Sequence, residues 1–152
     1  MSTEERFDAV VLGGGLLGCF AARHLTSYQL RCALIEARED VCTGISRGNS
    51  AIIYTGCDNK PGTLKARLCV QANRAFEELC AQLSVPFVRR GSLLVSYGPR
   101  GDYVVRRKYH QGLENGVENL EILTGTQAVA LEPGLASGIS SALLAPGTGV
   151  TD

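Results

Sequence analysis

The sequence predicts an α/β fold that opens with a parallel strand, helix, strand unit, and three observations carry this prediction. Residues 7–12 form an apolar run that ends at Gly13 and is typical of a strand buried on both faces. Apolar residues then recur at helical spacing over residues 16–28. A second apolar run, residues 32–35, is closed by Glu36. The unit spans about 30 residues, the length that a right-handed crossover requires.

Downstream, the pattern predicts a loop, a short strand and a long helix. Residues 38–50 are rich in Gly, Ser and Thr and predict an ordered loop, and residues 51–54 predict a short strand. A helix of about 20 residues should start near Thr63, after the Pro61-Gly62 turn. One face of this helix carries an apolar stripe at helical spacing, made of Leu64, Leu68, Ala72, Phe76, Leu79 and Leu83.

The second half of the chain predicts strands that lie outside the first sheet. Residues 87–97 follow Pro86 and predict one strand, and residues 102–115 predict a charged helix capped by Gly116. Residues 120–123 and 142–145 predict two further strands. We therefore expect two domains. Residues 1–84 contain the parallel sheet, and residues 85–152 begin a second domain with a sheet of its own.

Composition excludes several classes of function. The 152 residues include 15 basic and 15 acidic side chains, so the zero net charge offers no field to hold nucleic acid or an anionic membrane. Apolar runs are far shorter than the roughly 20 residues of a membrane span. Glu4 and Glu5 do not fit a secretory signal, so we expect a cytoplasmic protein. Six cysteines and two histidines stand at spacings that fit no zinc site, so no metal is expected.

Three glycines stand where the first predicted strand gives way to the first helix. Gly13, Gly15 and Gly18 form Gly-x-Gly-x-x-Gly. The first permits a sharp turn, the second lets the backbone approach a pyrophosphate, and the third lets helix and strand pack closely. Glu36 follows Gly18 by 18 positions, close to the spacing at which an acid binds a ribose hydroxyl. The same acid would repel the 2′-phosphate of NADP.

A tight corner between strand and helix is the alternative to a nucleotide site, because a glycine-rich turn can serve packing alone. The acid that ends the second strand favours the nucleotide site, since a mere corner needs no acid at that position. The pattern therefore predicts a Rossmann-like FAD/NAD(P)-binding fold with a parallel sheet. The first helix directs its unpaired N–H groups at the phosphates of the ADP part.

Six segments in order along the chain carry a family resemblance. They are residues 43–56 (TGISRGNSAIIYTG), 60–69 (KPGTLKARLC), 90–95 (RGSLLV), 112–117 (GLENGV), 131–133 (LEP) and 145–152 (APGTGVTD). The chain resembles the FAD-dependent oxidoreductases of the D-amino-acid oxidase superfamily, above all flavin glycerol-3-phosphate dehydrogenases and L-2-hydroxyglutarate oxidases. The resemblance covers essentially the whole chain and implies FAD as the cofactor.

The resemblance also implies cofactor contacts in three stretches. Around the pyrophosphate it implies Gly13, Gly15, Leu16, Leu17 and Gly18. Around the adenosine it implies Glu36, Ala37 and Arg38. Around the flavin half it implies Thr43, Ser46, Asn49, Ser50 and, against the ring, Ile53. The alternative for the third stretch is a surface loop rich in Asn and Ser, with local side-chain caps.

Tyr54 stands where members of the family often carry histidine. A phenol with a pKa of about 10 is a poor base at neutral pH, so we expect Tyr54 to serve as a hydrogen-bond donor to the substrate. We expect the cationic side chains in this part of the chain to be solvated, with Arg90 as an alternative clamp for an anionic hydroxy acid. They are Lys65, Arg67, Arg89, Arg90, Arg106, Arg107 and Lys108.

Two functions remain open from the sequence. In the first, the chain is an enzyme or the N-terminal part of one, and FAD accepts a hydride from glycerol 3-phosphate or a 2-hydroxy acid. In the second, it is a non-catalytic nucleotide-binding fragment or subunit that needs a partner chain. Related enzymes are longer and return to the first sheet, so we expect an uncovered sheet edge here.

Overall fold

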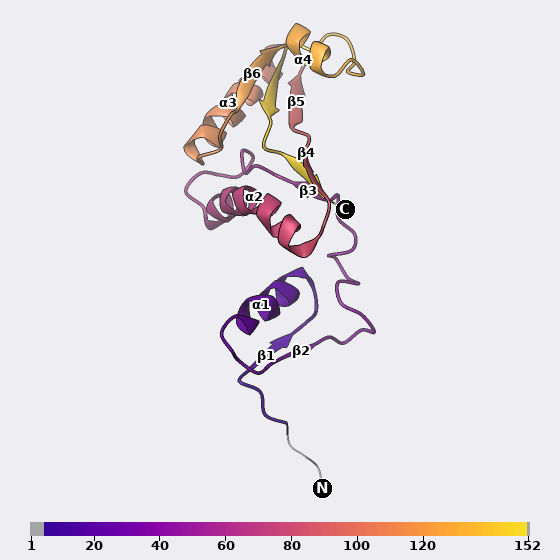
Figure 1. Ribbon diagram of the computed structural model, residues 1–152. Coiled ribbons are helices and arrows are strands. Elements are labelled where there is room, and N and C mark those ends of the chain that lie inside the picture. Colours follow the sequence, from indigo (N-terminus) through magenta and orange to yellow (C-terminus); the bar gives the residue numbers. More distant parts are fainter. Residues whose placement is uncertain (1–4, 152) are drawn as a thin grey trace. The chain divides into compact units, whose positions relative to one another are not determined.

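The computed structural model describes residues 5–151 (Figure 1). These residues form two compact units, 5–50 and 51–151, and each is described by itself. The structure therefore groups the long central helix with the second unit, whereas the sequence places residues 1–84 in one domain. Compactness alone does not define a functional domain, so the predicted domain assignment stays a prediction.

The first unit is the predicted parallel strand, helix, strand unit. Strand β1 (Ala9–Leu12) leads into helix α1 (Leu16–Thr26), which leads into β2 (Cys32–Ile35). The two strands pair in parallel, with Ala9 opposite Cys32 and Leu12 opposite Ile35. Helix α1 contacts both strands. The crossover helix returns the chain to the same end of the sheet, so both strands run in the same direction.

The prediction that β1 is buried on both faces is wrong for the described residues. Leu12 is 78% exposed, and Leu17 on α1 is 86% exposed. Within residues 5–50 the sheet consists of two strands with one helix against it, so no second layer covers the other face. An apolar run indicates that a strand packs against other apolar side chains. It does not indicate whether one or both faces of the strand are covered.

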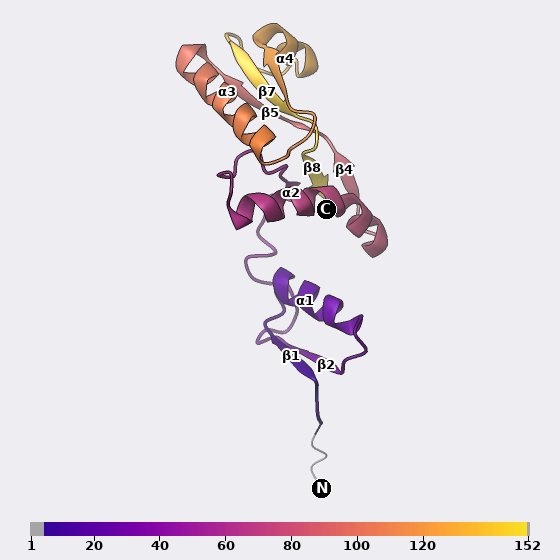
Figure 2. The same ribbon diagram turned by 90° about the vertical axis from the view of Figure 1, so that its left-hand side faces the viewer.

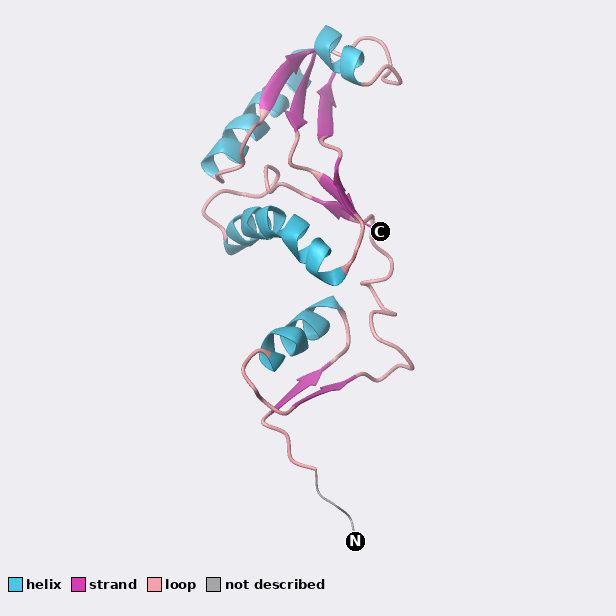
Figure 3. Cartoon of the chain, in the orientation of Figure 1, coloured by secondary structure: helices cyan, strands magenta, loops and turns pink. Residues whose placement is uncertain are grey.

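A long loop connects the two units. Residues 36–51 contain no helix or strand, as predicted for residues 38–50 (Figure 3). The second unit opens with the short strand β3 (Ile52–Ile53). Helix α2 (Leu64–Leu83) follows, and the hydroxyl of its N-cap Thr63 accepts a hydrogen bond from the Ala66 N–H at 3.2 Å. The predicted start and length of this helix are confirmed.

The buried face of α2 differs from its apolar stripe. The buried residues are Ala66, Val70, Asn73 and Cys80. Leu64, Leu68 and Leu83 of the stripe are exposed. The two sets lie on different faces of the helix because each buried residue follows a residue of the stripe by one or two positions, a turn of about 100° to 200° around the helix. In this unit the helix therefore turns a partly polar face toward its neighbours, which sequence periodicity did not predict.

The single strand predicted for residues 87–97 is wrong, because the chain forms two strands in different sheets. Strand β4 (Phe87–Arg89) pairs with β8 (Gly149–Thr151), and β5 (Ser92–Ser96) pairs with β7 (Ser141–Ala145). Between them Gly91 has a φ of +71°, a left-handed conformation that interrupts an extended strand. Apolar residues on both sides of Gly91 concealed this break from the sequence pattern.

Two antiparallel sheets organise the second unit, with strand orders β3-β8-β4 and β5-β7-β6. Strand β6 spans Glu121–Thr124. Helix α3 (Gly98–Glu114) lies along β5 and β7 (Figure 2), and its Val105 and the Leu143 side chain of β7 are fully buried in the core. Helix α3 begins four residues before the predicted start, because Pro99 fits the first turn of a helix.

Asp102 on α3 fastens this helix to the sheet. Its Oδ1 atom accepts a hydrogen bond at 2.6 Å from each of three serine hydroxyls, those of Ser96, Ser140 and Ser141. These bonds lower the pKa of the Asp102 carboxyl from 3.8 to about 2, because each of them stabilises the charged form.

Helix α4 (Gly125–Leu131), which the sequence pattern missed, follows β6 and begins with a capping box between Thr124 and Gln127. No helix among residues 5–151 is long and apolar enough to cross a bilayer.

Candidate functional site

The glycine turn between β1 and α1 has a different physical reason for each glycine. Gly13 has a φ of +99°, which a residue with a side chain rarely adopts. A Cβ atom at Gly18 would overlap the carbonyl oxygen of Gly13, so only glycine lets helix and strand approach this closely. A Cβ atom at Gly15 would find only the Ser46 hydroxyl oxygen nearby, at 3.7 Å. Nothing among residues 5–151 therefore requires glycine at position 15.

The turn lies beside an open hollow of about 560 Å³. Its lining consists of Leu12, Gly13, Gly15, Leu16, Leu17, Gly18, Ile45, Ser46 and Asn49. Seven of these nine are residues predicted to bind the cofactor, and the structure brings them together. Leu12 and Ile45 were not predicted, although Leu12 immediately precedes the glycine motif. The first turn of α1 borders the hollow, and its N–H groups have no acceptor within the helix.

The loop that follows β2 returns to the start of α1. The Leu16 N–H donates to the Ser46 hydroxyl at 3.1 Å, and the side-chain amide of Asn49 donates to the Ser46 carbonyl at 2.7 Å. Ser46 therefore joins the loop to the helix N-terminus. Four other predicted residues do not line the hollow, namely Ala37, Arg38, Thr43 and Ser50. The Arg38 guanidinium instead stabilises the loop by donating to the Thr43 carbonyl at 3.1 Å.

Glu36 lies against the turn. Its Oε2 atom accepts a hydrogen bond from the Gly14 N–H at 2.6 Å, and its Oε1 atom accepts one from the Arg38 N–H at 3.0 Å. These bonds, led by the one from Gly14, lower the pKa of the Glu36 carboxyl. The premise that a mere corner needs no acid here is therefore wrong, because this corner uses the acid to hold its own backbone. The predicted contact with ribose stays a prediction.

Gly14, the residue between the first two glycines of the motif, was not predicted as a site residue. Its carbonyl accepts hydrogen bonds from the Cys42 N–H at 2.8 Å and from the Cys19 thiol at 3.4 Å. Burial raises the pKa of the Cys42 thiol, and a hydrogen bond with Cys19 raises it further. With its N–H bound to Glu36, Gly14 is fixed at both ends of its backbone. A fourth glycine inside the motif is the signal in the sequence that could have identified this residue.

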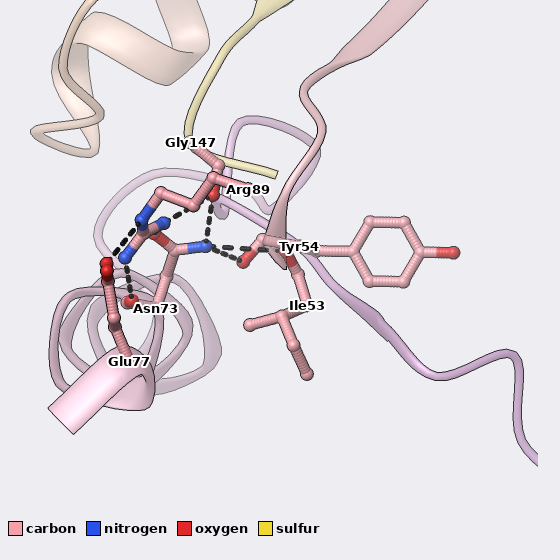
Figure 4. Close-up of polar contacts among 6 residues, drawn as sticks. All are labelled: Ile53, Tyr54, Asn73, Glu77, Arg89 and Gly147. Atoms are coloured by element: carbon pink, nitrogen blue, oxygen red, sulfur yellow. Dashed lines mark hydrogen bonds and ion pairs between the residues drawn. The ribbon is translucent and has the colours of Figure 1, made fainter. Parts of the chain in front are cut away.

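Ile53 and Tyr54 belong to the second unit. The Tyr54 side chain is 57% exposed, and in Figure 4 its ring points away from the polar contacts drawn around its backbone. Its carbonyl accepts hydrogen bonds from the Asn73 side-chain amide at 3.2 Å and from the Cys69 thiol at 3.6 Å. The phenol therefore faces outward, while the backbone carbonyl is bound by Asn73 and Cys69. The catalytic role predicted for Tyr54 stays a prediction.

Arg89 lies at the surface, but solvation is not its only role, because its guanidinium also binds protein atoms. Its guanidinium donates to the Gly147 carbonyl at 2.7 Å and to the Asn73 side-chain and backbone oxygens at 3.2 and 3.1 Å (Figure 4). Its Nε atom pairs with the Glu77 carboxylate at 3.2 Å. A guanidinium has five N–H donors, and this one uses them to join α2 to the segment before β8. Periodicity gave no sign of this role.

Comparison with known proteins places the whole chain in one family. The profile of the DAO family, described as FAD dependent oxidoreductase, matches residues 8–152. The chain is 41% identical over 144 residues to the glycerol 3-phosphate dehydrogenase of Caloramator mitchellensis. The matched region covers 95% of this chain and 30% of that protein. It is 33% identical over 152 residues to the mitochondrial L-2-hydroxyglutarate dehydrogenase of Caenorhabditis elegans, covering 97% of this chain and 34% of that protein.

Solved structures agree with this placement. The L-alpha-glycerophosphate oxidase of Mycoplasma pneumoniae, solved with FAD bound, matches with a TM-score of 0.89 at 25% identity, over 98% of this chain and 40% of that one. Glycine oxidase from Geobacillus kaustophilus shares the fold with a TM-score of 0.86 at 21% identity, over 97% of this chain and 41% of that one. The chain thus spans about a third of the length of the sequence relatives. It belongs to the family of FAD dependent oxidoreductases, and its α/β fold is the one that the sequence predicted.

Proposed function

We propose that this chain binds FAD and takes part in oxidising the hydroxyl-bearing carbon of glycerol 3-phosphate or a 2-hydroxy acid. The observation that carries the proposal is Gly15, which borders the open hollow and has no neighbour closer than 3.7 Å to the position of a Cβ atom. The fold does not require glycine at this position. Glycine is expected here if a ligand approaches the backbone so closely that a side chain would obstruct it. The family supports FAD, and the names of two relatives support the substrates.

The pyrophosphate would be held by backbone at the start of α1. The N–H groups of Leu17 and Gly18 have no acceptor in the helix, and the positive end of the helix dipole favours an anion there. The Leu16 N–H and the Ser46 hydroxyl already bind each other, so the hydroxyl offers its remaining lone pair or its proton to a ligand. Phosphate recognition here needs no lysine.

The remaining cofactor residues follow the family resemblance. Glu36, Ala37 and Arg38 would contact the adenosine, and each carboxylate oxygen of Glu36 keeps a lone pair for a ribose hydroxyl. Towards the flavin half we propose Thr43, Ser46, Asn49, Ser50 and Ile53. FAD would supply the hydride acceptor. Tyr54 would donate a hydrogen bond from its phenol to the substrate.

A nucleotide-binding subunit that needs a partner chain is the second candidate function. Apolar side chains exposed in the first unit, among them Leu12 and Leu17, favour it, because a face of this kind is stabilised when another surface covers it. The expected cytoplasmic location also stays a prediction, since the matched relative from Caenorhabditis elegans is named a mitochondrial enzyme. Cell fractionation decides the location.

An absorbance experiment tests the proposal and separates the two functions. The purified chain is incubated with FAD, freed of excess cofactor, and mixed without oxygen with glycerol 3-phosphate, L-2-hydroxyglutarate or, as a matched control, D-2-hydroxyglutarate. Bleaching of the flavin band by a hydroxyl donor indicates the oxidoreductase. Retained FAD that no donor bleaches indicates the binding subunit. A chain that retains no FAD and does not bind ADP contradicts the proposal.

A further inference from the structure

The segment between β3 and α2 has an unusual hydrogen-bond pattern, because side chains hold its backbone carbonyls. Residues 54–59 form no helix or strand, so their carbonyls find no partners in regular structure. Helix α3 and its C-cap residue provide three side-chain donors for the second part of the segment. They are Gln111, which donates to Cys57 and Asn59 at 3.2 and 2.6 Å, Asn115, which donates to Gly56 and Asn59 at 3.0 and 2.8 Å, and Lys108, which donates to Asp58 at 3.2 Å.

Asn73 of α2 holds the first part. Its side-chain amide nitrogen lies 3.4 Å from the Ile53 carbonyl oxygen, 3.2 Å from that of Tyr54 and 3.0 Å from that of Gly147. Asn73 is only 8% exposed, so these bonds form away from bulk water. Arg89 in turn donates to the side-chain oxygen of Asn73, which fixes the orientation of the amide.

Asparagine is chemically suited to this position. A neutral amide offers two N–H groups to carbonyls on one side and an oxygen to the guanidinium on the other. An aspartate would aim a second oxygen at the Tyr54 and Gly147 carbonyls, which have no proton to give. An apolar residue of similar size would take one donor from each of those oxygens, leaving the Tyr54 carbonyl with only the weak Cys69 thiol donor and the Gly147 carbonyl with Arg89. The position therefore requires a donor and an acceptor at once.

The consequence concerns the direction of Tyr54. The carbonyl of this residue is drawn toward Asn73, and its ring extends to the opposite side (Figure 4). Gly56, two residues on, has a φ of +97° and lies where a Cβ atom would come within 2.9 Å of the Val70 side chain, so only glycine fits there, and Asn115 binds its carbonyl at 3.0 Å. We propose that Asn73 is a positioning residue that fixes the outward direction of the Tyr54 phenol. The inference rests on the proposed function of Tyr54 as a donor to the substrate.

The test compares two substitutions of the same chemistry in the same segment. Asn73→Asp removes the donor behind Tyr54, whereas Asn115→Asp removes a donor at Gly56 and Asn59 and leaves the Tyr54 carbonyl bound. Each is made in the wild-type chain and in Tyr54→Phe. We expect Asn73→Asp to lower kcat about tenfold in the wild-type background and to change it little when Tyr54 is already phenylalanine. Asn115→Asp should give the same small change in both backgrounds. Equal losses from Asn73→Asp in both backgrounds would overturn the proposal.

Hydrogen exchange on the cofactor-free chain provides a readout that needs no activity. We expect the amides of residues 53–57 to exchange faster in Asn73→Asp than in the wild type or in Asn115→Asp, and unchanged exchange would also overturn the proposal. If the wild-type chain neither retains FAD nor binds ADP, the proposed function fails, while the exchange experiment still decides whether Asn73 holds this backbone. Should Asn73→Asp not fold, Asn73→Ser replaces it, because the shorter serine side chain withdraws the amide donor from the Tyr54 carbonyl without introducing a charge.

Discussion

The substitution Gly15→Ala tests whether position 15 is glycine because a ligand approaches it or because the fold requires it. Gly15 is the N-cap of α1, with φ of −71° and ψ of 178°, a conformation that alanine adopts without strain. The added methyl group would lie 3.7 Å from the Ser46 hydroxyl oxygen, an ordinary contact. It would also occupy the edge of the hollow where the pyrophosphate is proposed to approach. The matched control is Gly18→Ala, whose methyl group would overlap the Gly13 carbonyl oxygen.

The two variants should change different quantities. Gly15→Ala should change the Kd for FAD, and Gly18→Ala should change the free energy of unfolding. For Gly15→Ala, reduced freedom of the unfolded chain stabilises by about 0.4–1 kcal/mol, and the poorer N-cap costs a similar amount, so the free energy of unfolding should barely change. Loss of one charge-assisted hydrogen bond to phosphate, worth about 1.5–3 kcal/mol, should raise the Kd for FAD roughly 10- to 150-fold. Gly18→Ala should lower the free energy of unfolding by about 1–3 kcal/mol or more through overpacking.

Two measurements on each variant decide the matter. Thermal unfolding of the cofactor-free chain, followed by circular dichroism, reports the fold, and a titration that follows FAD fluorescence reports the Kd. A Gly15→Ala chain that unfolds like the wild type and binds FAD with the wild-type Kd would refute the assignment of the phosphate site. A Gly18→Ala chain that unfolds like the wild type would refute the packing argument from which the contrast is drawn.

Three further outcomes follow from hydrogen bonds and pKa shifts. Glu36→Gln should lower both the cofactor-free melting temperature and FAD affinity, since the Gly14 N–H loses its charged partner; a fall in affinity alone would contradict this and favour a ribose contact. The stabilisation from Asp102, whose folded pKa is about 2, should be complete above pH 3.8 and disappear as the pH falls toward 2; acid unfolding that is identical in Asp102→Asn would contradict it. Because burial raises the pKa values of the Cys42 and Cys57 thiols, both should react with iodoacetamide more slowly than a small free thiol at pH 8, as peptide mass spectrometry would show.

The first unit was predictable because its signals are local. Apolar runs of strand length, a helical stripe between them and a glycine motif at the junction all fall within residues 7–36. Each of these signals fixes backbone conformation over a few residues. The structure accordingly has β1, α1 and β2 where the sequence predicts them, and seven of the predicted site residues line one hollow.

The second unit was less predictable because its decisive contacts join residues far apart in the chain. The break between β4 and β5 depends on which sheet each strand joins. The partner of β4 is β8, which is distant in sequence and lay outside every predicted element. Asn73 interrupts the face of α2 that is buried, so a stripe of apolar residues pointed to the wrong face. Its partner Gly147 is 74 positions away, a separation that no periodicity can report.

The acid at the end of β2 shows where a sequence motif can mislead even when its residues are correctly located. A carboxylate at this spacing favours a nucleotide site over a simple corner between strand and helix. Glu36, however, accepts a hydrogen bond from the Gly14 N–H and so stabilises the corner itself. Its position is therefore explained by the protein alone, and it carries little weight for a ligand. Gly15 is different, because neither packing nor backbone conformation accounts for it. The case for a nucleotide in this hollow accordingly depends more on the glycine that the fold does not need than on the acid that it does.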